Sequence, residues 1–213
     1  MHNTTTEKLF SFIESSPTAF HAIETMRCRL DTEGYQPLLE GSDWNLQAGG
    51  KYYVIRNGSS IIAFRIPTAE WKGFQIMASH SDSPMFKIKE NPEMEAEGHY
   101  VKLNVEKYGG MLCAPWFDRP LSVAGRLVVK GGNQIVTKLV DVKKDLVMIP
   151  SLAIHMNREV NKGVELNKQT ELLPICGLSD DADYFLNFLV KELAVKKEDI
   201  LDFELTIYNK EKP

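Results

Sequence analysis

The chain has 213 residues, of which 43% are hydrophobic and 25% are charged, and its formal net charge at pH 7 is -4. This composition indicates a soluble globular protein with one large or two small domains. Because there is no overall positive field, nucleic acid is excluded as a partner. The N-terminus lacks a basic start and an apolar core, and no run approaches the ~20 apolar residues of a membrane helix, so we expect no membrane contact and a cytoplasmic location.

The three cysteines are widely spaced and form no Cys-x-x-Cys pair: Cys28, Cys113 and Cys176. Their number and spacing indicate neither a disulfide framework nor a thiolate zinc site. We therefore expect three buried thiols.

Two helices are predicted near the N-terminus. The capping box Thr4-x-x-Glu7 precedes apolar residues at helical spacing, which indicates a short amphipathic helix. A second helix is expected to begin at Ser16-Pro17 and to end before Gly34. Its apolar positions follow one face: Phe20, Ile23, Met26 and Leu30.

Residues 51–78 are predicted to be extended. Apolar runs at 52–55 and 61–66 flank Asn57-Gly58, which is the strongest short signal for a hairpin. The run at 74–78 has the length of a strand and is followed by small polar residues and Pro84. We expect it to be a buried strand that ends in a turn.

Strands dominate after Pro84. Alternating apolar residues predict strands around Leu103 and Leu205, and residues 121–129 and 134–139 predict a hairpin across Gly131-Gly132-Asn133. One helix is expected to interrupt these strands. Ser179 is its expected cap, Asp180 and Asp181 suit its N-terminus, and Lys196 and Lys197 close it. Its apolar face includes Phe185, Phe188, Leu189 and Leu193. Residues 91–98 are a candidate domain boundary.

His80 and Asp82 follow the strand predicted at 74–78. Open α/β sheets bind ligands beyond their strand ends, and residues two apart in a strand point to the same side. His80 could therefore bind Zn²⁺ through one ring nitrogen while Asp82 orients the other, or both could touch metal in a two-metal site. A solvated turn is the alternative.

The other histidines and one charged pair suggest local roles. His21 is expected to pack or cap within its helix, and His2 and His99 are expected to face solvent. The adjacent Asp118 and Arg119 can anchor a loop by a charge-assisted pair, and we interpret them as structural.

Several segments resemble, in the same order, the aspartyl aminopeptidases, the M18 family of zinc metallopeptidases. They are 16–22 (SPTAFHA), 80–84 (HSDSP), 105–110 (VEKYGG), 116–119 (WFDR), 124–126 (AGR), and 154–155 (IH) followed by 167–169 (NKQ). The resemblance covers nearly the whole chain but maps onto only about the N-terminal half of a family member. It implies an α/β fold, with residues 1–92 as the N-terminal part of the metallopeptidase sheet domain and 93–213 as a β-rich inserted domain of the dimerisation type.

The resemblance also implies roles for three residues. His80 would be a zinc ligand and Asp82 would support it, in an active site that holds two zinc ions through further Asp, Glu and His residues located beyond this chain. His155 would reach the active site of a neighbouring subunit and bind substrate, which requires at least a homodimer. Without the resemblance, His155 is interpreted as a satisfied or edge-facing histidine.

The function implied is that of a zinc aminopeptidase that releases acidic N-terminal residues, Asp or Glu, from peptides. A catalytic zinc generally needs three protein ligands, so the isolated chain is expected to be catalytically incomplete. The alternative is a non-catalytic truncated homologue that acts as an oligomerisation or assembly module.

Overall fold

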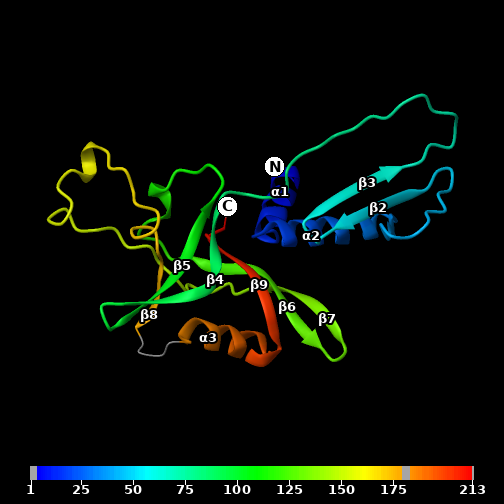
Figure 1. Ribbon diagram of the computed structural model, residues 1–213. Helices are drawn as coiled ribbons and strands as arrows, with labels where there is room; N and C mark the ends of the chain where they lie inside the picture. Colours follow the sequence, from blue (N-terminus) through cyan, green and yellow to red (C-terminus); the bar gives the residue numbers. More distant parts are fainter. Residues whose placement is uncertain (1–3, 179–182, 213) are drawn as a thin grey trace. The chain divides into compact units, whose positions relative to one another are not determined.

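The computed structural model describes residues 4–178 and 183–212 (Figure 1). Its contacts divide the chain into an N-terminal unit that ends at Ser83 and a C-terminal unit, Pro84–Glu211. The division precedes residues 91–98, which form the end of a strand and the turn after it. The assignment of 1–92 and 93–213 to a catalytic part and an inserted domain stays a prediction. Both units mix helix with sheet, so the α/β class is confirmed at this level.

The N-terminal unit contains two helices and a small sheet. The helices are α1 (Thr4–Glu14) and α2 (Ala19–Thr32), and the strands are β1 (Gln36–Leu38), β2 (Lys51–Arg56) and β3 (Ser60–Arg65). The strand order is β1-β2-β3, with β1 parallel and β3 antiparallel to β2. The hairpin between β2 and β3 forms where it was predicted, because Asn57 and Gly58 adopt the positive φ angles, 54° and 67°, that its turn requires.

The second helix starts two residues later than expected. Thr18, not Ser16, is its N-cap, and the Thr18 hydroxyl accepts the backbone N–H of His21. The ring Nδ1 of His21 lies 2.8 Å from the same hydroxyl, which confirms the predicted local role of this histidine. Gly34, at a φ of 77°, follows the helix end as predicted. The Tyr53 hydroxyl donates to Asp31 at 2.8 Å and fixes this helix to β2.

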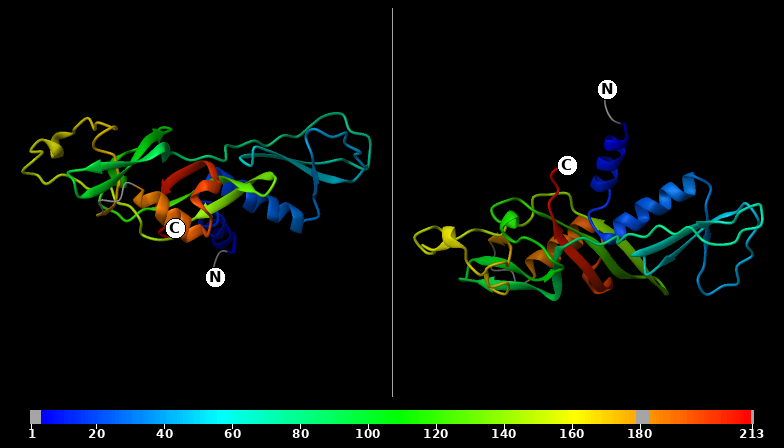
Figure 2. Two further views of the ribbon diagram at one scale, coloured as in Figure 1. Left: turned by 60° about the horizontal axis from the view of Figure 1, so that its bottom comes forward. Right: turned by 90° about the horizontal axis from the view of Figure 1, so that it is seen from above.

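The strand predicted at 74–78 does not form. The structure assigns no strand between β3 and Met85, and Figures 1 and 2 draw this part as a plain coil that leads away from the hairpin. Phe74, Ile76 and Met77 are exposed instead of buried. The composition of the run is that of a strand, but a strand needs a neighbour to take up its backbone hydrogen bonds, and the described residues supply none beside it.

The C-terminal unit is built on a six-stranded antiparallel sheet with the order β7-β6-β9-β4-β5-β8. Its strands are β4 (Met85–Ala96), β5 (Tyr100–Tyr108), β6 (Ser122–Gly131), β7 (Gln134–Asp141), β8 (Ile175–Leu178) and β9 (Ile200–Tyr208). The predicted alternation in β5, the predicted hairpin β6–β7 and the predicted strand around Leu205 are confirmed. The first and last strands of the unit are neighbours, because Phe86 of β4 pairs with Ile207 of β9.

One face of this sheet carries a continuous core that α3 (Tyr184–Leu193) covers (Figure 1). Phe185 and Leu189 are fully buried and pack among the apolar residues of the sheet. Ser179, Asp180 and Asp181, expected to begin this helix, lie outside the described residues. The helix ends at Leu193, before Lys196 and Lys197, because Ala194 turns into the left-handed conformation with a φ of 48°.

Gly125 allows β6 and β9 to approach closely. A Cβ atom at this position would lie 2.0 Å from the carbonyl oxygen of Glu204 on β9, well inside van der Waals contact. The next residue, Arg126, donates through Nε to the Glu204 carboxylate at 2.7 Å across the same strand pair. Residues 124–126 therefore have a structural role in the pairing of β6 with β9.

The three cysteines differ in exposure, which corrects the expectation of three buried thiols. Cys176 is buried and Cys113 partly buried, but Cys28 is exposed on α2 beside Glu24 and Arg27. The buried residues of this helix are Ala22 and Ile23, and Cys28 does not share their covered face. No helix in the described part of the chain combines the length and apolarity needed to cross a membrane.

Shortening Leu205 tests the core of the C-terminal unit. Leu205→Ala should lower the free energy of unfolding by about 3 kcal/mol, because it opens a cavity in a fully buried site. Leu201→Ala, on the same strand but exposed, should cost less than about 1 kcal/mol. Urea unfolding followed by Trp116 fluorescence, with Trp44 and Trp71 replaced by Phe, measures both. Equal losses would contradict the assigned core.

The thiols should react in the order of their exposure. Burial, reinforced by the nearby charge of Glu93, raises the pKa of the Cys176 thiol to about 12, so it has almost no thiolate at pH 8. With an aromatic disulfide reagent at pH 8, Cys28 should react in the native protein and Cys176 only after unfolding in urea. Cys28→Ser should remove the fastest native reaction, and Cys176→Ala should leave it intact. Native labelling of Cys176 at the rate of Cys28, located by peptide mass spectrometry, would refute this order.

Candidate metal centre

His80 and Asp82 lie in the coil that follows the uncovered run at 74–78. This coil is attached to the β2–β3 hairpin by Ser81, whose hydroxyl donates to the carbonyl oxygen of Ser59 at 2.9 Å. His80 and Asp82, on either side of Ser81, come together within this coil and not, as predicted, through the pleat of a strand.

Asp82 holds the His80 ring in one orientation. The ring Nδ1 lies 2.8 Å from the backbone carbonyl oxygen of Asp82 and 3.2 Å from its carboxylate. A carbonyl oxygen can only accept, so Nδ1 carries the proton and donates. In the neutral ring the lone pair then resides on Nε2. This is the tautomer in which a histidine ligates a metal through Nε2 while a neighbouring oxygen orients its other nitrogen.

The described residues do not supply a complete zinc site. Across 4–178 and 183–212, no group of three or more His, Cys, Asp or Glu side chains lies close enough together to hold a metal ion. A catalytic zinc is usually held by three protein ligands and keeps a further position open. The side chain of His80 is 82% exposed and lies beside the carboxylate of Asp82.

His155 belongs to a long irregular loop of the C-terminal unit, drawn in yellow in Figure 1, which includes the short helix η2 (Val160–Lys162). The residue is exposed, and so are its neighbours Ile154 and Met156. A turn closed by a 2.8 Å hydrogen bond from the Met156 N–H to the Ala153 carbonyl presents it. Because His155 and both of its apolar neighbours are exposed, contact with another molecule explains this histidine better than packing inside the protein does.

Asp118 fastens the start of this loop. Its backbone N–H donates to the carbonyl of Ile149 at 2.9 Å, and its carboxylate accepts the N–H of Ser151 at 2.8 Å. Asp118 makes these two bonds in the left-handed conformation, with a φ of 56°, that non-glycine residues rarely adopt. The predicted loop-anchoring role is therefore observed, but the partner is a backbone N–H and not Arg119. No sequence pattern links positions 33 residues apart.

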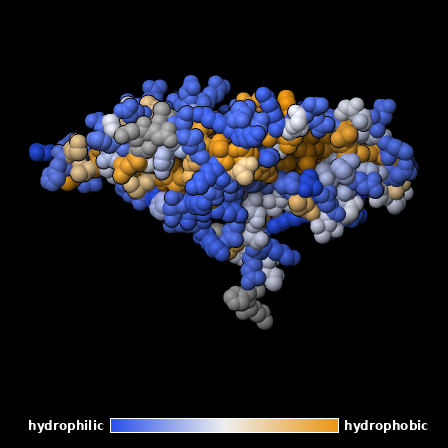
Figure 3. All heavy atoms as spheres, turned by 90° about the horizontal axis from the view of Figure 1, so that it is seen from below, coloured by the Kyte–Doolittle hydropathy of each residue, from blue (hydrophilic) through white to orange (hydrophobic). Residues whose placement is uncertain are grey.

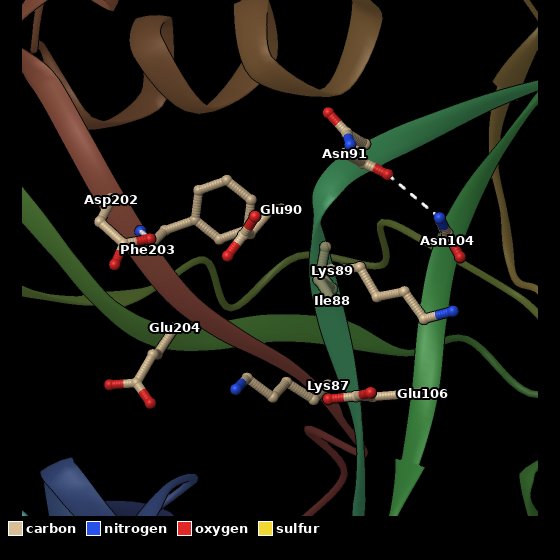
Figure 4. A pocket seen from close by; sticks show the side chains of 10 residues that line it. All are labelled: Lys87, Ile88, Lys89, Glu90, Asn91, Asn104, Glu106, Asp202, Phe203 and Glu204. Carbon is tan, nitrogen blue, oxygen red and sulfur yellow. Dashed lines mark hydrogen bonds between the residues drawn. The ribbon is translucent and has the colours of Figure 1, made fainter.

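A shallow hollow of about 480 Å³ lies over β4, β5 and β9 and includes neither His155 nor Asp118 in its lining (Figure 4). Its charged lining carries both signs: Lys87, Lys89, Glu90, Glu106, Asp202 and Glu204. Asn104 donates to the carbonyl of Asn91 at 3.3 Å within it. It contains no histidine or cysteine, and the mixture of charges is typical of the solvated face of a sheet.

Comparison with known proteins identifies the family. The model of the aminopeptidase I zinc metalloproteases (M18) matches residues 12–213. The chain belongs to this family. A probable M18 family aminopeptidase 2 of Clostridium novyi (strain NT) is 48% identical over 213 residues, which cover 96% of this chain and 49% of the relative.

Solved structures of M18 proteins share the fold. The structure of mApe1 from Chaetomium thermophilum gives a TM-score of 0.88 at 29% identity and covers 98% of this chain and 51% of that chain. The mApe1 dodecamer of S. cerevisiae gives 0.80 at 26% identity, with 97% and 48% covered. The chain spans about half the length of the curated M18 relatives it matches.

The bond from Ser151 to Asp118 should depend on pH. This hydrogen bond holds the pKa of the Asp118 carboxyl below its ordinary value of 3.8. A lowered pKa means that the bond is fully present above pH 3.8 and is lost as the pH falls through the lower, folded-state value. The amide signal of Ser151, followed by NMR, should therefore titrate with a midpoint below 3.8. Asp118→Asn should abolish this titration, and a midpoint at or above 3.8 in the native chain would contradict the assignment.

Proposed function

We propose that this chain contributes the zinc ligand His80 to an M18 aminopeptidase that releases acidic N-terminal residues, Asp or Glu, from peptides. The observation that supports it most directly is the orientation of the His80 ring, whose Nδ1 is held by Asp82 so that Nε2 points outward as a ligand. The match of the chain to a zinc metalloprotease family supplies the metal and the reaction class. The preference for acidic residues rests on the resemblance to aspartyl aminopeptidases.

Asp82 serves in this proposal as a positioning residue. A carboxylate or carbonyl behind a metal-binding histidine fixes its tautomer and raises its basicity, and loss of such a partner typically costs 10–100-fold in metal affinity or activity, as an order of magnitude. The remaining zinc ligands and the general base are proposed to come from the part of an M18 aminopeptidase that this chain does not match. Two zinc ions per complete active site are part of the proposal.

His155 is proposed to contact substrate in the active site of a neighbouring subunit. Its exposure on the loop that Asp118 fastens supports this role, because the side chain is available to another molecule and the loop has a fixed start. A homo-oligomer, at least a dimer, is then required. The M18 protein of S. cerevisiae forms a dodecamer.

The second candidate is an assembly module without catalysis. The C-terminal unit favours it, because this unit has a continuous core, whereas no metal-binding group of three is present among the described residues. In this case His80 and Asp82 form a solvated turn.

A single-chain chimera separates the two candidates. Residues 1–213 replace the matched part of the Clostridium novyi relative, and hydrolysis of peptides that begin with Asp, Glu, Ala or Leu is measured. We expect cleavage of the acidic pair. Asp82→Ala should lower kcat/KM roughly 10–100-fold, and His80→Ala should lower it at least as much together with the zinc content.

His99→Ala is the matched control. His99 is also an exposed histidine, but it lies in the turn between β4 and β5, so its removal should change neither rate nor zinc content. A chimera that assembles and stays inactive would favour the assembly module. Activity that survives His80→Ala would contradict the ligand role, and cleavage of Ala and Leu peptides alone would refute the acidic preference.

A further inference from the structure

Arg119 is partly buried and has no partner among the described residues. Its Nε is shielded from solvent, and no hydrogen-bond acceptor there reaches it. Within residues 4–178 and 183–212 the side chain takes part in no ion pair or ring contact either, because the adjacent Asp118 carboxylate accepts the N–H of Ser151 instead. Hydrophilic residues, in blue, cover most of the face shown in Figure 3, where water solvates their polar groups. Arg119 differs from them, because a buried donor without an acceptor is uncommon and costs stability.

The backbone on both sides of Arg119 is fixed. Before it, the two hydrogen bonds of Asp118 hold the chain at the start of the long loop. After it, Pro120 favours an extended backbone at the residue that precedes it. The N–H of Leu121 then donates to the carbonyl of Val147 at 2.8 Å. The side chain of Arg119 therefore starts from a preorganised position, which lowers the entropy that binding would cost.

Only the far end of the Arg119 side chain is open to solvent. Nε is closed off, whereas Nη1 and Nη2 are not among the buried unpartnered atoms of the described chain. Because these two nitrogens have no partner, they are exposed. A guanidinium held in this way presents two N–H groups in the geometry that a carboxylate accepts with both of its oxygens. The residue is therefore suited to bind a carboxylate from another molecule.

Arg119 and His155 are attached to the same part of the C-terminal unit. Ser151 is bonded to Asp118, which precedes Arg119, and Ser151 lies four residues before His155. Four residues span at most about 14 Å even when they are fully extended. A bound peptide of a few residues can therefore touch both side chains.

We propose that Arg119 binds the side-chain carboxylate of an N-terminal Asp or Glu in the substrate that His155 contacts, so that it determines the acidic specificity. This inference rests on the proposed function, which supplies the acidic substrate and the role of His155. The substrate then provides the negative charge that the described chain does not place beside this arginine. The C-terminal carboxylate of a short peptide has the same chemistry, and the experiment separates the two sources.

The chimera of residues 1–213 with the Clostridium novyi relative provides the test. Its substrates are C-terminally amidated peptides that begin with Asp or with Asn, which differ in a carboxylate against an amide. Arg119→Gln should lower kcat/KM for the Asp peptide at least about tenfold and leave that for the Asn peptide within about threefold. Arg119→Lys should retain part of the Asp rate, because it keeps the charge but loses the planar pair of donors.

Arg158→Gln is the matched control. Arg158 is an exposed arginine of the same loop, and it lacks the fixed backbone of Arg119, so its loss should leave both rates within about threefold. Equal losses for the Asp and Asn peptides in Arg119→Gln would indicate a structural role and overturn the proposal, as would no loss. A loss confined to peptides with a free C-terminal carboxylate would overturn it too. So would an Asp preference that depends on Arg158 alone.

If the chimera is inactive, binding to the 213-residue chain tests the inference without catalysis. The Nε–H signal of Arg119 in NMR spectra, assigned by its absence in Arg119→Lys, is followed while the amidated peptides are added. The Asp peptide should shift this signal at concentrations at least about tenfold lower than the Asn peptide. Equal shifts or none would overturn the proposal.

The two proposals fail in different ways. A selective shift by the Asp peptide with an inactive chimera would refute the peptidase function alone. An active chimera whose preference for Asp survives Arg119→Gln would refute this inference alone.

Discussion

A β-strand persists only where a neighbour takes up its backbone hydrogen bonds, and this requirement separates the two units of the chain. In the C-terminal unit every strand from β4 to β9 has a partner, and α3 closes the core. In the N-terminal unit an equally apolar run at 74–78 has none, so it remains coil with its side chains in water. The candidate metal centre belongs to the N-terminal unit, because His80 follows the unpaired run.

Features encoded by near neighbours could be predicted from the sequence. Asn57-Gly58 predicted the first hairpin, the alternation around Leu103 predicted β5, and Gly34 predicted the end of α2. Features that depend on distant partners could not. The run at 74–78 has the pattern of a strand but lacks a partner, and the exposure of Cys28 depends on which side of α2 the sheet covers.

The candidate site shows the same limit on a smaller scale. The spacing of two residues predicted that His80 and Asp82 would meet through the pleat of a strand, but no strand forms there, and the contact comes from the backbone carbonyl of Asp82 at 2.8 Å from the ring. The number of further ligands depends on residues far away in sequence and was not encoded locally. The bond between Asp118 and Ser151, which fastens the loop of His155, joins two positions that no motif connects.

The pairing of Phe86 with Ile207 has a consequence for the history of such proteins. The C-terminal unit begins and ends on adjacent strands, about 4.8 Å apart, and carries every strand of its sheet with it. A stretch of gene that encodes it can enter a host protein at a single surface loop, because the host needs to open that loop by no more than the width of two strands. A ladder that joins the two ends of a unit is thus the geometry in which domain insertion is tolerated.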